Sequence, residues 1–292
     1  MKKTILIIII SIVSLIVVLL LASLFRSLYV KSTIETKTHN VSNTYNHINI
    51  ETTIVDINIY KSNDGTNKVI TKENNSFKFD VSVSNGTLFI KEVDNRKFYD
   101  RIFSFGEYKV NLYLALDVIE SLVINGATGD VTVEKGLVFN TSSIQITTGD
   151  IEFSSNVLKT MNIKNTTGDV EVEDNNTFCD IEIKTTTGDV DITDVNCSSL
   201  KVSLTTGDVD LSSVIVTKDI TVNSTTGDIT FDGIDGANIY ITVTTGDVEG
   251  TILTSKFFVA ESTTGKINVP HTREGGDCII KTTTGSIFVK YK

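Results

Sequence analysis

The sequence of 292 residues contains no tryptophan, one proline, three cysteines and three histidines. Three cysteines are too few for a disulfide framework, and their spacing matches no zinc site, so we expect Cys179, Cys197 and Cys278 to be small buried hydrophobic residues. No histidine has a cysteine or carboxylate at metal-ligand spacing. The sequence also lacks a Gly-rich phosphate loop, a nucleophile elbow and a zinc-protease helix motif. These absences argue against an enzyme.

Basic residues are also scarce relative to acidic ones. The chain has 26 Lys and Arg against 36 Asp and Glu, which gives a formal net charge of −10. Nucleic-acid binding requires Lys and Arg to neutralise phosphates, so we expect no nucleic-acid partner. An acidic exterior instead fits cations, cationic peptides or simple solubility.

One long apolar run is present, from Thr4 to Phe25, and it carries no charge. A bilayer-spanning helix needs about 20 apolar residues, so the run predicts a single transmembrane helix. Lys2 and Lys3 precede it, which predicts a cytoplasmic N-terminus and an extracellular body. A cleaved signal peptide is the alternative, but its apolar region is usually about 7–15 residues long, and the leucine two places before Ala22 fits its cleavage site poorly.

Residues 42–125 alternate apolar and polar residues and so read as strands. Asn85-Gly86 lies between two alternating runs, which is the strongest short hairpin signal. We expect this part to cap the membrane-near end of a stack of strands. The predicted organisation is a cytoplasmic N-terminus at 1–3, a transmembrane helix at 4–25, a linker at 26–41, a β-rich cap at 42–125 and repeats at 126–292.

A motif close to Thr-Thr-Gly-Asp-Val returns nine times, at intervals of 19 or 20 residues. A fixed period of this size is typical of stacked copies of one supersecondary unit, each too small to bury its apolar face alone. The repeat glycines are Gly129, Gly149, Gly168, Gly188, Gly207, Gly227, Gly246, Gly265 and Gly285.

Aligned on this glycine, the copies show apolar columns on both sides of it. The residue two places after it is β-branched in every copy, and the residue four places after it is apolar except at Gly250. Each copy therefore predicts two inward-facing strands joined by a glycine corner. The predicted fold is an all-β, right-handed parallel β-helix of about nine rungs. The six-residue repeat of left-handed helices is missing, and propeller blades need about 40–45 residues.

The residue directly after the glycine is aspartate in seven copies and then lysine and serine in the last two. Carboxylates about 5 Å apart repel by about 0.8 kcal/mol even in bulk water, so this ladder needs compensation. Either it holds divalent cations such as Ca²⁺ or a cationic peptide, or each aspartate bonds the amides of its own corner. No other cofactor and no catalytic residue is predicted. The candidate ladder comprises Asp130, Asp150, Asp169, Asp189, Asp208, Asp228 and Asp247.

Three segments, INIETTIVDINIYKSNDG, VSNGTLFIKEVDNRKFYD and YKVNLYLALDVIESLVINGATGDV, precede the glycine-marked repeats. In this arrangement residues 42–292 resemble a bacterial family of unknown function, the β-strand-repeat "putative adhesins" of the cell envelope. Ala115 departs from it, since relatives often carry proline there. The resemblance implies a β-helical surface domain that acts in adhesion or envelope-stress sensing. Related domains occur in proteins that respond to membrane-active antibiotics. The family offers no catalytic residues.

The sequence therefore predicts a non-enzymatic surface protein of the bacterial envelope, adhesin-like or sensing stress and antimicrobial peptides. Expected partners are the membrane and an envelope polymer, a cationic peptide or another protein. The second hypothesis is a scaffold that self-associates through an uncapped final rung at Ile279–Tyr291. A polysaccharide-degrading β-helix enzyme is a remote third, because such a site needs an irregular cluster of acids and bases that this repeat lacks.

Overall fold

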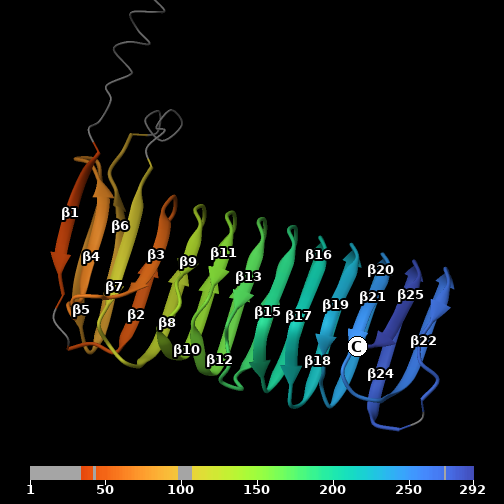
Figure 1. Cartoon of the computed structure of the whole chain (residues 1–292). Coiled ribbons are helices and arrows are strands. Elements are labelled where there is room, and N and C mark those ends of the chain that lie inside the picture. Colours follow the sequence, from red (N-terminus) through yellow and green to blue (C-terminus); the bar gives the residue numbers. More distant parts are fainter. Residues whose placement is uncertain (1–33, 42–43, 98–106, 273) are drawn as a thin grey trace, which may run out of the picture. The chain divides into compact units, whose positions relative to one another are not determined.

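The computed structural model describes residues 34–41, 44–97, 107–272 and 274–292 (Figure 1). The chain divides into two compact units, Met1–Glu35 and Thr36–Lys292, and the fold below is that of the second. Its regular structure within the described ranges consists of strands alone, as predicted. No helix in these ranges is long and apolar enough to cross a membrane, and the predicted helix at 4–25 lies outside them.

The strands form two sheets, which we call sheet A and sheet B (Figure 1). The spatial order in sheet A is β1 (Glu35–Asn40), β4 (Lys68–Glu73), β7 (Lys109–Leu114), β3 (Asp56–Lys61), β9 (Val131–Val133), β11 (Ile151–Phe153), β13 (Val170–Glu173), β15 (Val190–Cys197), β17 (Val209–Val216), β19 (Ile229–Ile234), β21 (Val248–Ile252), β25 (Ile287–Tyr291) and β23 (Ile267–Asn268). The order in sheet B is β22 (Lys256–Thr264), β24 (Gly276–Thr284), β20 (Asn238–Thr245), β18 (Asp219–Thr226), β16 (Ser199–Thr206), β14 (Asp180–Lys184), β12 (Asn156–Lys164), β10 (Val138–Gln145), β8 (Ile119–Asn125), β2 (His47–Glu51), β6 (Thr87–Asp94) and β5 (Phe77–Ser84).

Each repeat glycine lies between a strand of sheet B and the next strand of sheet A, so one copy of the motif makes one turn of a β-solenoid. Neighbouring turns pair in parallel and keep the columns of the sequence in register, as in Val190 with Val209 and Ile183 with Val202. In eight of the nine turns both strands have three or more residues, whereas β23 has only two. The all-β solenoid is therefore confirmed, with about eight full turns.

The core is the space between the two sheets. The β-branched residue two places after the glycine is 0% exposed in eight turns, from Val131 to Ile287, and Ile267 is the exception at 45%. The three cysteines are buried and free, as predicted. Burial raises the pKa of the Cys179 thiol to about 11. The stack therefore has one continuous hydrophobic interior, and its turns depend on their neighbours for burial.

The corner requires glycine for two separate reasons, which Gly188 illustrates. Its φ of +132° lies in a region that L side chains rarely adopt. A Cβ at this position would also lie 2.1 Å from the carbonyl oxygen of Gly168 in the preceding turn. The strict recurrence of glycine thus follows from the close stacking of successive corners.

At the N-terminal end of the stack, the order of turns departs from the order of the chain. Strands β2 and β3 pair directly with β8 and β9, while β6 and β7 lie one turn further out. Strands β4 and β5 then add antiparallel neighbours to β7 and β6. Asn85 and Gly86 turn the β5–β6 hairpin with φ of +50° and +75°, as the sequence predicted. The aromatic side chains of Phe77, Phe79 and Tyr108 are buried at this end.

At the other end, the last two turns exchange places. Ile280 of β24 pairs with Ile241 on one side and with Ala260 on the other, so β24 and β25 lie inside the stack. The predicted uncapped final rung at Ile279–Tyr291 is therefore wrong, and the free edges at this end belong to β22 and β23. Figure 1 shows β22 as the outermost labelled strand there.

A glycine pair makes this exchange sterically feasible. A Cβ on Gly275 would lie 1.9 Å from the carbonyl oxygen of Ser255, and one on Gly276 would lie 1.7 Å from that of Ala237. The chain thus passes between the two turns that already carry Ser255 and Ala237. Only residues without a side chain can approach both backbones so closely.

Candidate functional site

The seven aspartates of the ladder form one continuous chain of hydrogen bonds. The backbone N–H of each aspartate donates to the Oδ1 of the aspartate one turn earlier, as from Asp189 to Asp169 at 2.8 Å. The other five bonds of this kind measure 2.7–2.9 Å and have as donors Asp150, Asp169, Asp208, Asp228 and Asp247.

The chain of bonds is closed at both ends by residues outside the aspartate column. The N–H of Asp130 donates to the Oδ1 of Asp56 at 3.2 Å, and the N–H of Ser286 donates to the Oδ1 of Asp247 at 2.6 Å. The N–H of Lys266 then donates to the Oγ of Ser286 at 3.3 Å. The serine and lysine that replace aspartate in the sequence therefore mark the end of the ladder in space.

This geometry differs from the expectation that each aspartate bonds amides of its own corner. The glycine corners stack so closely that the amide of the adjacent turn is the nearer partner. One oxygen of each carboxylate is engaged in this way, which stabilises the join between turns. Within the part of the chain that the structure describes, no group of three or more His, Cys, Asp or Glu is placed to hold a metal ion.

A second file of carboxylates lies on the outer face of sheet A, two residues further along each strand. Glu152, Glu171, Asp191 and Asp210 stand on four neighbouring strands, each directly in register with the next. We call these four residues the acidic column. The sequence shows these acids, but the candidate site was placed on the aspartate ladder beside them.

The pKa values of three acids in the acidic column are raised, with neighbouring carboxylates as a secondary cause. Partial burial, followed by the charge of Asp210, raises the pKa of Asp191. Partial burial, followed by the charge of Asp208, raises the pKa of Asp210. For Glu171 the pKa is raised first by a hydrogen bond to Glu173 and then by burial and neighbouring carboxylates. A positive charge placed here would relieve this repulsion.

The outer face of sheet B differs, because some of its acids are paired with lysines. Glu182 lies 2.7 Å from Lys184 and 3.2 Å from Lys201, and Glu261 lies 2.9 Å from Lys281. Within the described ranges, no residue of the acidic column takes part in an ion pair. Among the described residues the acidic column thus lacks ion pairs, whereas Asp232 further along sheet A is paired with Lys292 at 2.8 Å.

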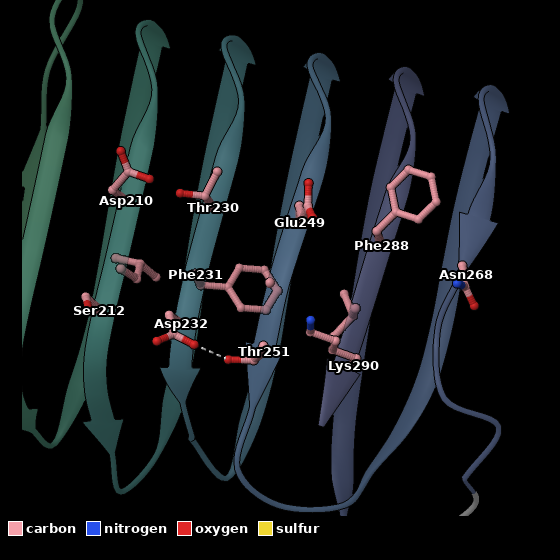
Figure 2. A pocket seen from close by; sticks show the side chains of 13 residues that line it. Asp210, Ser212, Thr230, Phe231, Asp232, Glu249, Thr251, Asn268, Phe288 and Lys290 are labelled. Carbon is pink, nitrogen blue, oxygen red and sulfur yellow. Dashed lines mark hydrogen bonds between the residues drawn. The ribbon is translucent and has the colours of Figure 1, made fainter. Parts of the chain in front are cut away.

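The acidic column runs into a shallow pocket of about 410 Å³ over the last turns of sheet A (Figure 2). Two rows of side chains line it, one with Asp210, Thr230 and Glu249, the other with Asp232 and Thr251, which are hydrogen-bonded at 2.6 Å. We call this pocket the trough.

Gly250 also lines the trough. The ring of Phe288, which is 36% exposed, lies at its far part (Figure 2). The trough therefore combines the carboxylates of Asp210 and Glu249 with an apolar contact, while Lys290 also lines it and Asp232 is paired with Lys292 at 2.8 Å. Sequence reasoning missed it, although Gly250 is the one residue of its column without an apolar side chain.

Comparisons with known proteins give the family of the chain. Solved structures that match include a "putative adhesin" from Bacteroides fragilis (18% identity, 88% of this chain and 97% of that chain, TM-score 0.44). A "putative adhesin" from Parabacteroides distasonis matches at 13% identity (88% and 98%, TM-score 0.47). A "putative lipid binding protein" from the same species matches at 15% identity (89% and 98%, TM-score 0.45).

No curated protein sequence matches the chain significantly. The family model named Toastrack DUF4097 matches residues 45–214 and 175–292, which together span most of the chain. The resemblance of the sequence to a β-solenoid family of unknown function is thereby confirmed, and the chain belongs to the Toastrack DUF4097 family.

Proposed function

We propose that this chain is a membrane-anchored, non-enzymatic interaction protein of the bacterial envelope, and that the outer face of sheet A binds cationic amphipathic peptides. The anchor in this proposal is the apolar run Thr4–Phe25, with the solenoid outside the cell. Peptide sensing and adhesion are the two roles such binding serves.

The observation that carries the proposal is the acidic column, which has no cationic partner in the described part of the chain. Like charges about 5 Å apart repel by about 0.8 kcal/mol at bulk-water dielectric, and by more where burial lowers the dielectric. A bound cation converts this repulsion into attraction at several positions at once. Because the acids recur at the spacing of parallel strands, about 4.8 Å, they suit a ligand with several positive charges along its length.

The trough explains why the proposed ligand is amphipathic rather than only charged. Phe288 lines the trough together with Asp210 and Glu249 (Figure 2). An apolar side chain of a peptide can cover the Phe288 ring while neighbouring Lys or Arg side chains reach the acids. Burial of an apolar side chain contributes about 25 cal/mol per Å² of surface removed from water.

The test is a binding titration on the full chain in nanodiscs of uncharged lipid, with a fluorescent Lys/Leu amphipathic peptide as the probe. Empty nanodiscs give the background. The double variant Asp191→Asn/Asp210→Asn should weaken binding about tenfold. Salt at 500 mM should weaken binding to the wild type, because a higher ionic strength shortens the Debye length and screens the charges. The matched control is Glu182→Gln on sheet B, which removes one charge from a paired acid and should leave the affinity unchanged.

Equal affinity of the wild type and the double variant would refute the acidic column as the binding site. If the wild type and the double variant bound an uncharged envelope polysaccharide with equal affinity at low and high salt, the partner would be the polysaccharide and not a cationic peptide. Depolymerisation of an acidic polysaccharide by the pure protein would overturn the non-enzymatic role altogether.

A further inference from the structure

We propose that the free end of the solenoid, formed by β22 and β23, pairs with the same end of a second copy about a two-fold axis. The proposal is independent of the peptide-binding function, since it concerns the end of the stack rather than the outer face of sheet A. It replaces the hypothesis of association through Ile279–Tyr291, which the structure places inside the stack.

The first observation is that the core is uncovered at this end. Residues that point inward are fully buried in the internal turns, but Ile267 is 45% exposed and Phe258, Ala260 and Val269 are only partly buried. Phe257 beside them is 42% exposed. Exposed apolar side chains that gather at one place on a soluble surface are typical of an interaction site.

The second observation is that both sheets end here with an unpaired strand edge. Among the strands that the structure describes, β22 pairs with β24 alone and β23 pairs with β25 alone. Apart from the carbonyl of Lys256, which accepts a 2.6 Å hydrogen bond from the Thr272 hydroxyl, the free edge of β22 presents backbone N–H and C=O groups without a strand partner among the described residues. Edges of this kind template pairing with another strand.

At the opposite end of the stack, β1 and β5 are also edge strands, but the core there is covered, which favours a closed dimer over an open filament. There the antiparallel strands β4 and β5 are added, and Val69, Phe77 and Tyr108 are at most 2% exposed. An apolar end docked on the opposite end would meet a core that is already covered, and so would find no matching apolar surface. A contact between two identical ends is self-complementary and stops at two copies.

A second copy of the chain can pair with the free edges of β22 and β23 at the same time. The chain runs along sheet B and returns along sheet A, so the two free edges have opposite directions and a fixed separation. A two-fold axis that passes between the two stacked ends sets β22 antiparallel to its copy and β23 antiparallel to its copy. A single peptide strand would pair with one edge and leave the other edge and the core uncovered.

The charges at this end permit such a contact. Phe257, Phe258, Val259 and Ala260 form an uncharged run in the edge strand. Lys256 does not protrude, because its side chain is buried and its Nζ lies 2.7 Å from Asp235. Lys266 stands at one corner, and antiparallel pairing puts the two copies of it at opposite corners, about 30 Å apart for a nine-residue strand.

The test is cysteine cross-linking of the full chain in detergent at 50 µM, with a short bismaleimide. Single cysteines at Phe257, Val259 and Glu261 sample outward positions along the edge strand, while Ser82→Cys on β5 at the opposite end is the control. The native cysteines are buried. Two-fold pairing predicts a dimer band that peaks at one of the three edge positions and exceeds the Ser82→Cys level at least fivefold.

A second variant tests whether the core end drives the contact. Ile267→Lys in the best cross-linking background should reduce the dimer at least fivefold, since it places a charge among the apolar groups. Leu158→Lys, at a residue of similar exposure (41% against 45%) in the middle of the stack, should leave it unchanged. Cross-linking no greater than at Ser82, or equal cross-linking with and without Ile267→Lys, would overturn the proposal.

Discussion

The backbone N–H of Asp189 donates a 2.8 Å hydrogen bond to Oδ1 of Asp169, a residue 20 positions earlier in the chain. The bond joins two turns of the solenoid outside their strands, at the glycine corner. Because the same bond recurs along the stack, the aspartate of the repeat acts as a fastener between turns. The hydrogen bond requires an acceptor oxygen at the Oδ1 position, but it does not require the negative charge of the aspartate.

Replacement of Asp169 separates the acceptor from the charge. Asp169→Ala removes the acceptor and should lower the free energy of unfolding by about 1 kcal/mol. Asp169→Asn keeps an acceptor oxygen and removes one charge from a crowded file, so it should leave stability within about 0.5 kcal/mol of the wild type or above it. Urea denaturation followed by circular dichroism measures both. Equal losses in the two variants would show that the charge, not the acceptor, stabilises the corner.

The repeat glycines should tolerate no side chain. Gly188→Ala combines a φ of +132° with a Cβ only 2.1 Å from the Gly168 carbonyl oxygen, so we expect a loss of about 3 kcal/mol or more. The control is Gly65→Ala, where φ is +71° and a Cβ would meet nothing within 4 Å. It should cost about 1 kcal/mol for backbone strain alone. Thermal denaturation of both variants checks the difference, and similar melting temperatures would contradict the steric argument.

The sequence predicts most of this fold because its columns record burial directly. Val190 and Val209 occupy the same column in the alignment and the same register in sheet A. The corner glycines were likewise placed by their period. What the period cannot report is the spatial order of equal turns, because Gly265 and Gly285 keep the usual spacing while their turns exchange places.

Weak signals of the exchange are nevertheless present in the sequence. Ala260 is the smallest residue of its apolar column, and Lys266 replaces aspartate in the ladder. Both fit a turn with one neighbour, which has less core to fill and no next corner to fasten. The adjacent glycines 275 and 276 mark the crossing. The acids of the acidic column can be read from the sequence. Their lack of cationic partners cannot, because it depends on where the lysine side chains lie, and several lysines pair with acids of sheet B instead.

The raised pKa values of the acidic column should make the stability of the protein depend on pH. The pKa values of Asp191 and Asp210 are higher in the native state than in the unfolded state. At a pH between the unfolded and the native pKa, the native state therefore binds more protons than the unfolded state. Stability from these groups therefore increases as pH falls through the raised pKa and is lost as pH rises through it. Asp180 acts in the opposite sense, because a hydrogen bond from Ser199 is the main cause that lowers its pKa.

The difference between the wild type and Asp191→Asn/Asp210→Asn isolates this contribution. We expect the double variant to melt at a higher temperature than the wild type at pH 7, and the difference to shrink toward pH 4. The matched control Asp180→Asn should instead be destabilising at pH 7, because it removes a group whose native pKa is lowered. Parallel melting curves for the wild type and the double variant at all pH values would contradict the assignment.

Calcium should have little effect on the aspartate ladder. One oxygen of each carboxylate already accepts an N–H, as Asp208 does from Asp228 at 2.7 Å. Ca²⁺ prefers six to eight oxygen ligands, which this spacing does not bring together. At ten times its Kd a bound ion would add about 1.4 kcal/mol, which shifts the melting temperature by about 2–4 °C. We expect a smaller shift between millimolar Ca²⁺ and chelator. A shift of that size, abolished by Asp169→Asn/Asp189→Asn/Asp208→Asn, would instead establish a cation site.

The ion pair of Lys256 and Asp235 should be the most sensitive polar contact at the free end. Lys256 is 4% exposed, and its Nζ lies 2.7 Å from the Oδ1 of Asp235. Asp235→Ala leaves a buried ammonium without its counter-charge and should cost about 3 kcal/mol. Lys256→Met removes the charge, keeps the apolar stem and leaves a carboxylate that can reach water, so its cost should be smaller. The double variant Lys256→Met/Asp235→Ala should be more stable than Asp235→Ala alone, because no unpaired charge remains buried. Urea denaturation of the three variants measures the coupling, and strictly additive losses would show that the two side chains stabilise the end of the stack independently.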